Sequence, residues 1–447
     1  MPSRLRAYAS TAWLRSIMPA ELKALLRAIR DLLRRAGQLP LQTPAARRAA
    51  VQEELQALST RPTISIVLPT YRTELRYLRE AVDSVRGQRY PEWELCIVDD
   101  GSGQPELQRA LSAYAASDSR IKFRPLAQNG GISAASNVGL EMCEGEFVAF
   151  LDHDDTLTPD ALLRVAQALA ADPELDVVYS DSDKLTIRNL RGDPFLKPDW
   201  SPTYALGAMY VGHLLVVRRS VADAAGGFDS SFDTIQDFEF MLRVSERTDR
   251  IHHIPQILYH WRAIPGSIAA GTDQKGSVEE LQPRAVSAHL ARRGVAVRAR
   301  AHPAIPHRAE LAPPEAGAPT PPVSVIVGAG RAGDANRLLG SLLERTGYPD
   351  LEIIAIDGGG LEVEDPRLRR LDASGHPLGR GAANNRAAAE AGGRHLIFLG
   401  PETEIADGDW IERLLLHAAL PGVVAVGPML VRPGGTVAQA GVAIGLR

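Results

Sequence analysis

The segment ISIVLPTYRTELRYLREAVDSVRGQRYPEWELCIVDDGS, residues 64–102, decides the fold. It begins with a short apolar run, Ile64–Pro69, and continues into a helical stretch over Leu75–Val85. A second apolar run, Trp93–Val98, ends in two carboxylates, a glycine and a serine. Strands that alternate with helices of this length are typical of βαβ units, which predict a parallel sheet.

The same alternation continues toward the C-terminus. A helix over Glu106–Ala116, a strand near Ile121–Arg124, a helix after Gly131 and a strand over Phe147–Leu151 are expected. We therefore predict an α/β fold with a doubly wound, mostly parallel sheet. Such sheets bind ligands at the carboxyl ends of their strands, and the polar motifs of this sequence lie at those ends.

The pattern starts again after residues 312–322, a Pro-rich stretch that predicts a stiff linker. The corresponding segments, in the same order, are Val323–Val327 with Ile64–Leu68, Leu351–Asp357 with Leu95–Asp99, Ala383–Asn385 with Ala135–Asn137, and His395–Leu399 with Phe147–Leu151. We predict four parts: a basic helical region (1–60), a first domain (61–275), a helical extension with the linker (276–322) and a shorter second copy (323–447).

Composition sets broad limits on function. The 447 residues are 45% hydrophobic and 23% charged, with a formal net charge of −4, so nothing favours a nucleic-acid partner. The two cysteines, Cys96 and Cys143, lie in apolar segments and are expected to be buried free thiols of a reducing compartment. No apolar run has the length of a transmembrane helix, and the N-terminus lacks a signal-peptide core, so we predict a cytoplasmic protein.

Residues 1–48 are strongly basic, and their leucines recur at helical spacing. This pattern predicts an amphipathic helix. It could lie peripherally on the anionic inner face of the cell membrane, or it could pack on the first domain or on a partner.

The strongest chemical motif is Phe150-Leu151-Asp152-His153-Asp154-Asp155. Side chains alternate along a strand, so Asp152 and Asp154 are expected to point the same way. Convergent carboxylates repel unless a cation separates them, and hard oxygen ligands suit Mg²⁺ or Mn²⁺. The alternative is an acidic turn that caps the next helix.

Two further motifs follow strands. Asp99 and Asp100 could accept hydrogen bonds from a nucleobase or a ribose, or could simply form a turn. The small residues of Asn129–Asn137 open a helix whose free N–H groups suit a phosphate or sugar, although a capped, tightly packed helix is equally compatible.

Later motifs carry candidate acids, bases and clamps. Asp237 lies near a helix start, where a carboxylate can be a general base or a partner of the helix dipole. His260 could be a third metal ligand or a structural histidine, and Arg262 could clamp a diphosphate. His213 is a candidate acceptor-site residue.

Taken together, these motifs resemble the inverting glycosyltransferases of family 2, which have the GT-A fold. The resemblance covers residues 63–270. It rests on Pro69–Arg72, Val98–Ser102, Asn137–Gly139, Leu151–Asp155, Gln236-Asp237 and His260–Arg262.

The resemblance implies a role for each matching residue. The nucleotide would be bound by Pro69, Tyr71, Asp99, Asp100, Asn137, Asp152 and Arg262. The metal, Mg²⁺ or Mn²⁺, would be held by Asp152, Asp154 and His260. Asp237 would be the base that deprotonates the acceptor. Acceptor or secondary roles would fall to Asp155, His213, Gln236, Glu239 and Trp261.

The resemblance also implies the substrates. The donor would be a nucleotide-diphosphate sugar, first a UDP-sugar, with dTDP- or GDP-sugars as alternatives. A hexosyl or deoxyhexosyl group would pass to a hydroxyl of a glycan or lipid-linked glycan. The chain also resembles tandem-domain members that build bacterial cell-surface polysaccharide.

The second copy departs from the pattern. Gly400-Pro401-Glu402-Thr403 stands opposite Asp152–Asp155, and Gly358 stands opposite Asp100. We therefore expect a degenerate, truncated GT-A-like domain without catalysis.

Two other functions fit the sequence less well. A sugar-nucleotide pyrophosphorylase would need a Gly-rich basic loop where Pro69–Thr73 stands. A scaffold of two inactive copies fits residues 323–447 but not the first domain, where every expected carboxylate is present.

Overall fold

The computed structural model describes residues 44–264, 275–314, 317, 320–372 and 379–439. The predicted amphipathic helix of residues 1–48 lies largely outside the described residues. The chain forms two compact units, one of Met1–His289 with Ala301–Glu310 and one of Leu290–Arg300 with Leu311–Arg447. No helix in the described part of the chain has the length and apolar character needed to cross a membrane.

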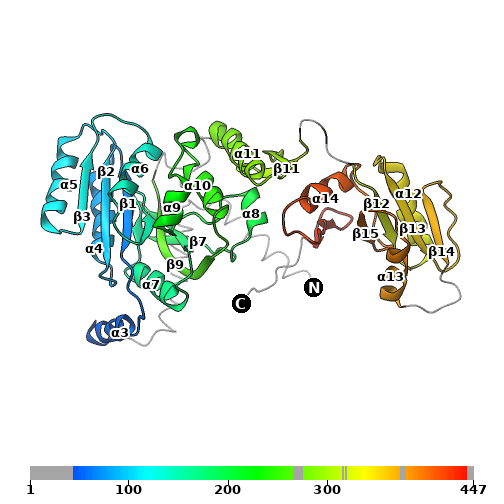
Figure 1. Ribbon diagram of the computed structural model, residues 1–447, viewed down its shortest axis with the longest axis horizontal. Helices are drawn as coiled ribbons and strands as arrows, with labels where there is room; N and C mark the ends of the chain where they lie inside the picture. Colours follow the sequence, from blue (N-terminus) through cyan, green and yellow to red (C-terminus); the bar gives the residue numbers. More distant parts are fainter. Residues whose placement is uncertain (1–43, 265–274, 315–316, 318–319, 373–378, 440–447) are drawn as a thin grey trace, which may run out of the picture. The chain divides into compact units, whose positions relative to one another are not determined.

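The first unit is built on a nine-stranded sheet with the order β3-β2-β1-β4-β8-β6-β9-β5, in which β7 pairs with β6. Figure 1 shows β3, β2 and β1 side by side at one end of this sheet. The strands are β1 (Ile64–Thr70), β2 (Trp93–Asp99), β3 (Ile121–Pro125), β4 (Phe147–Phe150), β5 (Thr156–Leu157), β6 (Val177–Thr186), β7 (Arg191–Phe195), β8 (Leu215–Arg218) and β9 (Ile251–Ala263). The predicted α/β fold is confirmed, and β1–β4 are parallel as expected. The antiparallel pairs formed by β5, β7 and β8 were not predicted.

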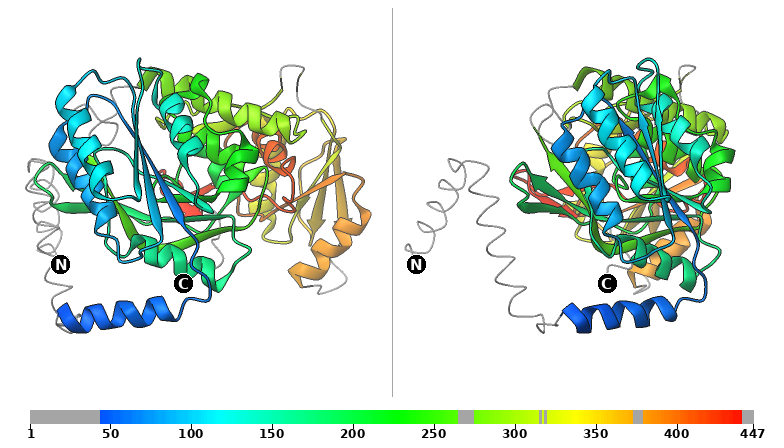
Figure 2. Two further views of the ribbon diagram at one scale, coloured as in Figure 1. Left: turned by 60° about the vertical axis from the view of Figure 1, so that its left-hand side comes forward. Right: turned by 90° about the vertical axis from the view of Figure 1, so that its left-hand side faces the viewer.

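Helices cover both faces of this sheet (Figure 2). They are α3 (Pro44–Gln56), α4 (Leu75–Arg86), α5 (Pro105–Ser117), α6 (Ile132–Met142), α7 (Ala161–Ala171), α8 (Pro202–Gly207), α9 (Arg219–Ala225) and α10 (Gln236–Ser245). Alternation along β1 explains the two layers. Ile64, Ile66 and Leu68 pack with α4, α5 and α7, whereas Val67 packs with Phe150 and α10 on the other face. Gly139 of α6 lies so close to Val67 that a Cβ there would clash with the valine.

The second unit has a four-stranded parallel sheet with the order β14-β13-β12-β15, which repeats the order β3-β2-β1-β4. Its strands are β12 (Val323–Val327), β13 (Leu351–Asp357), β14 (Leu368–Asp372) and β15 (His395–Leu399), and its helices are α12 (Ala332–Arg345), α13 (Arg380–Glu390) and α14 (Trp410–Ala418). The remaining described elements are helix α11 (Lys275–Arg292), a short 3-10 helix (Ser230–Phe232) and two strand pairs, β10 (Arg298–Ala301) with β11 (Ala309–Ala312) and β16 (Leu430–Val431) with β17 (Val437–Gln439).

The two sheets share a polar lock at the start of their first strands. In the first unit, Ser65 donates to Glu94 (2.6 Å) and accepts from the Gly145 amide (2.9 Å). In the second unit, Ser324 donates to Glu352 and accepts from the Gly393 amide (2.8 Å). Identical contacts at equivalent positions support the predicted repeat beyond the apolar pattern.

The repeat is not complete in the described residues. Strand β4 is followed in the first sheet by β8, but no described strand pairs with the outer edge of β15. Phe398 takes the register position of Phe150, yet it is 52% exposed where Phe150 is 9% exposed. The part of this apolar face that lies on β15 is therefore exposed among the described residues of the second unit, whereas α13 covers the same face over β12 and β13.

Candidate functional site

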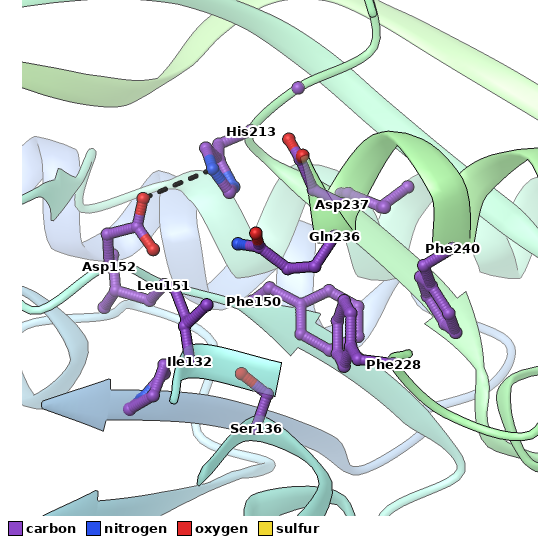
Figure 3. Close-up of a pocket in the computed structure, with 13 residues that line it drawn as sticks. Ile132, Ser136, Phe150, Leu151, Asp152, His213, Phe228, Gln236, Asp237 and Phe240 are labelled. Carbon is purple, nitrogen blue, oxygen red and sulfur yellow. Dashed lines mark ion pairs between the residues drawn. The ribbon is translucent and has the colours of Figure 1, made fainter. Parts of the chain in front are cut away.

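A pocket of the first unit opens at the carboxyl ends of β1 and β4 (Figure 3). Segments far apart in the sequence line it: Pro69, Ile132, Ser136, Phe150, Leu151, Asp152, Gly212, His213, Leu215, Phe228, Gln236, Asp237 and Phe240. Phe150, Phe228 and Phe240 pack edge to face or tilted against one another beneath it. The pocket therefore has an aromatic wall and a polar side made by four different segments.

Asp152 and His213 face each other across this pocket. The Nε2 atom of His213 lies 3.3 Å from Oδ2 of Asp152, as the dashed line in Figure 3 marks. The imidazole stacks on the ring of Tyr259 at 4.9 Å, and its Nδ1 atom is buried without a hydrogen-bond partner among the described residues. The structure thus places His213 next to the strongest carboxylate motif. The sequence alone offers only weak support for His213 as a site residue.

Asp237 lies in the first turn of α10 and lines the same pocket. Burial raises the pKa of its carboxyl group. The nearby His213 opposes this rise, and the charge of Asp152 adds to it. A carboxylate with a raised pKa holds a proton more readily, as a general base requires.

Gln236 lies beside Asp237 and directs its amide toward Asp152 in Figure 3. Its Oε1 atom is buried without a hydrogen-bond partner within the described ranges. A buried polar atom of this kind is costly unless a ligand or water satisfies it. The atom is therefore available to a ligand in the pocket.

Asp155 has a structural environment. It is fully buried and accepts hydrogen bonds from the Tyr259 hydroxyl (2.6 Å) and from the Arg262 amide (2.6 Å). The same Tyr259 hydroxyl accepts from the amide of Asp152 (3.2 Å). Asp155 and Tyr259 therefore fix the backbone that carries Asp152.

The carboxylates of this loop suffer mutual repulsion. Burial raises the pKa of Asp154; His153 lowers it, and the charge of Asp152 raises it further. Asp154 has His153 as a partner at 3.7 Å. A cation beside Asp152 and Asp154 would relieve this excess of negative charge.

The described residues hold no full set of protein ligands for a metal. Across the described residues, no three or more His, Cys, Asp or Glu side chains gather as a metal site. His260 pairs instead with Asp183 (2.6 Å) and does not line the pocket. Mg²⁺ commonly uses one or two carboxylates together with water and substrate phosphates. The residues thus fit a cation held by Asp152 and Asp154, and they do not fit the predicted three-ligand set.

Arg262 is not at the pocket. Its side chain has no exposed surface and donates to the Asp154 carbonyl, to Asn189 and to Glu80, each at 2.6 Å. The guanidinium also lies 4.9 Å from the ring centre of Tyr77. This placement leaves no N–H surface for a diphosphate and indicates that Arg262 supports the loop of Asp152–Asp155 from behind.

Two of the residues predicted to bind the nucleoside can be reached by a ligand, and two are buried. Pro69 lines the pocket, and Tyr71 is 39% exposed. Asp99 and Asp100 are buried and serve loops: Asp99 accepts from the Ser102 amide (3.2 Å), and Asp100 accepts from the amides of Gly130 (2.8 Å) and Gly131 (3.0 Å) and from the Asn129 side chain (2.7 Å). Asp100 therefore shapes the entry to α6.

Asn137 also has a structural partner. Its side chain donates to the Phe228 carbonyl (2.8 Å) and accepts from the Phe228 amide (2.7 Å). These bonds tie α6 to the loop that carries one wall of the pocket. Asn137 is therefore placed to support the pocket from behind.

Glu239 and Trp261 lie away from the pocket. Glu239 is buried against Arg243, with N–O distances of 2.6 and 2.7 Å. Trp261 is 36% exposed and lines a second hollow with Asp183, Phe195 and Met209.

Two residues next to the pocket carried no sequence signal. Asp233 accepts from the Ser133 amide (3.3 Å), and a Cβ at Gly131 would clash with its carboxylate. The start of α6, predicted to suit phosphate, is therefore met by a carboxylate. Lys197 is buried behind the His213 segment. Both contacts join residues distant in sequence, so no local pattern could have revealed them.

Comparisons with known proteins match one segment of the chain to a known family. Residues 65–225 match the model of "Glycosyl transferase family 2". The chain is 40% identical over 414 residues to the "O-antigen biosynthesis protein RfbC" of Myxococcus xanthus, covering 90% of this chain and 32% of that protein. It is 37% identical over 411 residues to "Uncharacterized protein y4gI" of Sinorhizobium fredii, covering 89% and 45%. The chain thus spans less than half the length of these relatives.

Among solved structures, that of S. aureus TarS in complex with UDP-GlcNAc aligns with a TM-score of 0.41 at 22% identity, covering 52% of this chain and 72% of that one. The family match rests on the sequence comparisons and includes β1, β2 and the Asp152 loop. The chain therefore contains a glycosyl transferase family 2 domain over residues 65–225.

Proposed function

We propose that the first unit transfers a sugar from a nucleotide-diphosphate sugar to an acceptor hydroxyl, with inversion at the anomeric carbon. The observation that carries this proposal is the pocket itself. It joins Asp152, at the end of β4, to Asp237, at the start of α10, in a chain that contains a family 2 domain.

Asp237 is assigned as the base. A single displacement needs a group that takes the proton of the acceptor hydroxyl as that oxygen attacks the sugar. Burial raises the pKa of Asp237, and this supports the role because a more basic carboxylate accepts the proton more readily. The charge of His213 opposes this rise and would limit how far the pKa of Asp237 increases. Positioned base catalysis typically contributes about 10²–10⁴-fold to the rate.

Asp152 and Asp154 are assigned to a divalent cation, Mg²⁺ or Mn²⁺. Such a cation would neutralise the negative charge that develops on the departing diphosphate. Asp155, Tyr259 and Arg262 would hold the loop in place, and His260 would act only through Asp183. The buried, fully engaged state of Arg262 supports a positioning role in preference to direct contact with diphosphate.

The nucleoside is assigned to the side of the pocket near Pro69 and Tyr71, with Asp99, Asp100 and Asn137 shaping the surrounding loops. A UDP-sugar is the first donor to test, followed by dTDP- and GDP-sugars. The Oε1 atom of Gln236 has no hydrogen-bond partner among the described residues. It would accept a hydrogen bond from a hydroxyl group of the sugar donor or of the glycan acceptor.

The acceptor is proposed to be a glycan or lipid-linked glycan of the bacterial cell surface. The name of the Myxococcus relative, an O-antigen biosynthesis protein, supports this class. Trp261 and Phe195 offer exposed aromatic faces on which a sugar ring can pack. Residues 1–48 remain a candidate for peripheral membrane contact. The second unit is proposed to be inactive, because Gly400 and Pro401 bring no side-chain oxygen.

A transfer assay tests this proposal. Wild type and Asp237→Asn would be compared for nucleoside diphosphate released from a panel of nucleotide sugars with Mn²⁺, with the anomeric configuration of the product read by NMR. We expect release by wild type, an inverted product, and a loss of about 10²-fold or more in the variant. Glu141→Gln is the matched control, since it removes an exposed charge of α6 that lies only 3.8 Å from the exposed Arg124. Near-normal activity of Asp237→Asn, equal to that of Glu141→Gln, would refute the assignment.

A further inference from the structure

A buried lysine lies behind the His213 side of the pocket. Lys197 follows β7 in the chain, is only 6% exposed and does not line the pocket. Its ammonium group donates to the backbone carbonyls of Val211 and His213, the latter at 2.7 Å. Lysine is almost never fully buried without compensation, because removing its charge from water is costly. The two carbonyls supply part of that compensation.

The groups around Lys197 fix the residue without neutralising its ammonium by direct contact. Asp181 of β6 accepts from the Lys197 backbone amide (2.8 Å) and from Nε2 of His253 (2.9 Å). Oδ1 of the exposed Asp199 lies 3.3 Å from Nδ1 of the same imidazole. The ring of Tyr179 stacks on this imidazole with 4.8 Å between the ring centres. Burial lowers the pKa of Lys197 to about 7, against the charge of Asp181. A neutral amine keeps two N–H groups, so both carbonyl bonds survive loss of the proton.

The carbonyls that Lys197 binds lie on either side of Gly212, which has a φ of +46°. This is the left-handed region, which glycine adopts at no steric cost. The turn ends at His213, whose ring stacks on Tyr259 and approaches Asp152. The position of the imidazole therefore depends on the turn, and the turn is held from behind by Lys197.

We infer that Lys197 is a positioning residue: by bridging the carbonyls of Val211 and His213, it fixes the turn that holds His213 beside Asp152 and Asp237. The importance of this turn for catalysis rests on the proposed function, whereas the contact between Lys197 and the turn does not. An apolar side chain of similar length could fill the space. It would leave two carbonyls without their donor and release the turn.

The experiment compares Lys197→Met with Lys122→Met in the full chain. Lys122 is the matched control because it too donates to a backbone carbonyl, that of Met142 (3.1 Å), and pairs with Glu94 (2.7 Å), but it makes no contact with the turn. Protein labelled with ¹³C in the histidine rings would be examined by NMR, and the His213 signal would be identified by its loss in His213→Gln.

We expect the His213 signal to shift or split in Lys197→Met and to coincide with wild type in Lys122→Met. UDP binding with Mn²⁺, measured by calorimetry, should weaken at least about fivefold in Lys197→Met and less than about twofold in the control. If wild type binds no UDP, the proposed donor is wrong, while the NMR comparison still decides the positioning role.

Lys197→Gln gives a second variant if Lys197→Met does not fold, since its shorter amide cannot bridge both carbonyls; the same shift is expected. An unchanged His213 signal in a folded Lys197 variant would overturn the inference. So would an equal change in Lys122→Met, or failure of both Lys197 variants to fold while Lys122→Met folds, because Lys197 would then serve the fold as a whole.

Discussion

Replacing Arg262 by methionine should destabilise the first unit strongly. The guanidinium is fully buried, and the change removes donors to the Asp154 carbonyl, to Asn189 and to Glu80. Removing one partner of a buried ion pair costs about 3–5 kcal/mol, and Glu80, which is 27% exposed, can regain some hydration, which favours the lower end of that range. For a domain of this size, each kcal/mol lowers the melting temperature by roughly 2–4 °C. The expected fall is therefore about 6–20 °C.

Scanning calorimetry of the full chain would measure this fall, with Arg86→Met as the control. Arg86 pairs with Asp83 on the exposed surface of α4, so its loss should cost at most about 1 kcal/mol. A fall below about 2 °C in Arg262→Met, combined with lost nucleotide affinity, would refute the structural role and restore the diphosphate clamp that the sequence suggested.

The same variant has a predicted pH dependence. Burial acts to raise the pKa of Glu80, but the hydrogen bond from Arg76 and the charge of Arg262 hold it below its ordinary value of 4.5. A carboxyl group whose pKa is lowered by folding stabilises the protein above its ordinary pKa, and this contribution is lost as the pH falls through the folded value. The difference in melting temperature between wild type and Arg262→Met should therefore be largest near neutral pH and shrink in acid.

Further predictions concern the loops and the repeat. Asn137→Ala should lower the free energy of unfolding by about 1–3 kcal/mol in urea titrations, because it leaves the Phe228 amide and carbonyl without partners; weaker nucleotide binding at unchanged stability would contradict this. Gly145→Ala should lower the melting transition of the first unit, since its Cβ would lie 2.6 Å from Ser65 Oγ, and Gly393→Ala should act in the same way on the second unit; variants that melt like wild type would argue against the shared lock.

The sequence predicts the parallel half of the first sheet because that half obeys a local rule. Strands β1 and β2 are buried on both faces, so they appear as short apolar runs between amphipathic helices. The antiparallel strand β8 has only four residues, Leu215–Arg218, and it pairs with β4 and β6, which lie far from it in the sequence. Its pairing could not be predicted from periodicity.

The site shows the same division. The carboxylate motif at Asp152 could be predicted because it directly follows an apolar strand, and the structure brings it into one pocket with Asp237. The environment of Arg262 could not be predicted, because its burial depends on Glu80, which belongs to a distant helix. Motif spacing thus locates chemistry-bearing residues, but tertiary partners decide which of them face the pocket.

The metal dependence of nucleotide binding decides whether Asp152 has the proposed role. Titration calorimetry of the full chain with UDP would be run with Mn²⁺, with Mg²⁺ and after chelation, for wild type and for Asp152→Asn. We expect binding by wild type only when the metal is present, and loss of that binding in the variant. Equal affinity with and without metal, or unaltered binding by Asp152→Asn, would contradict the proposal that Asp152 holds a cation needed to bind the diphosphate.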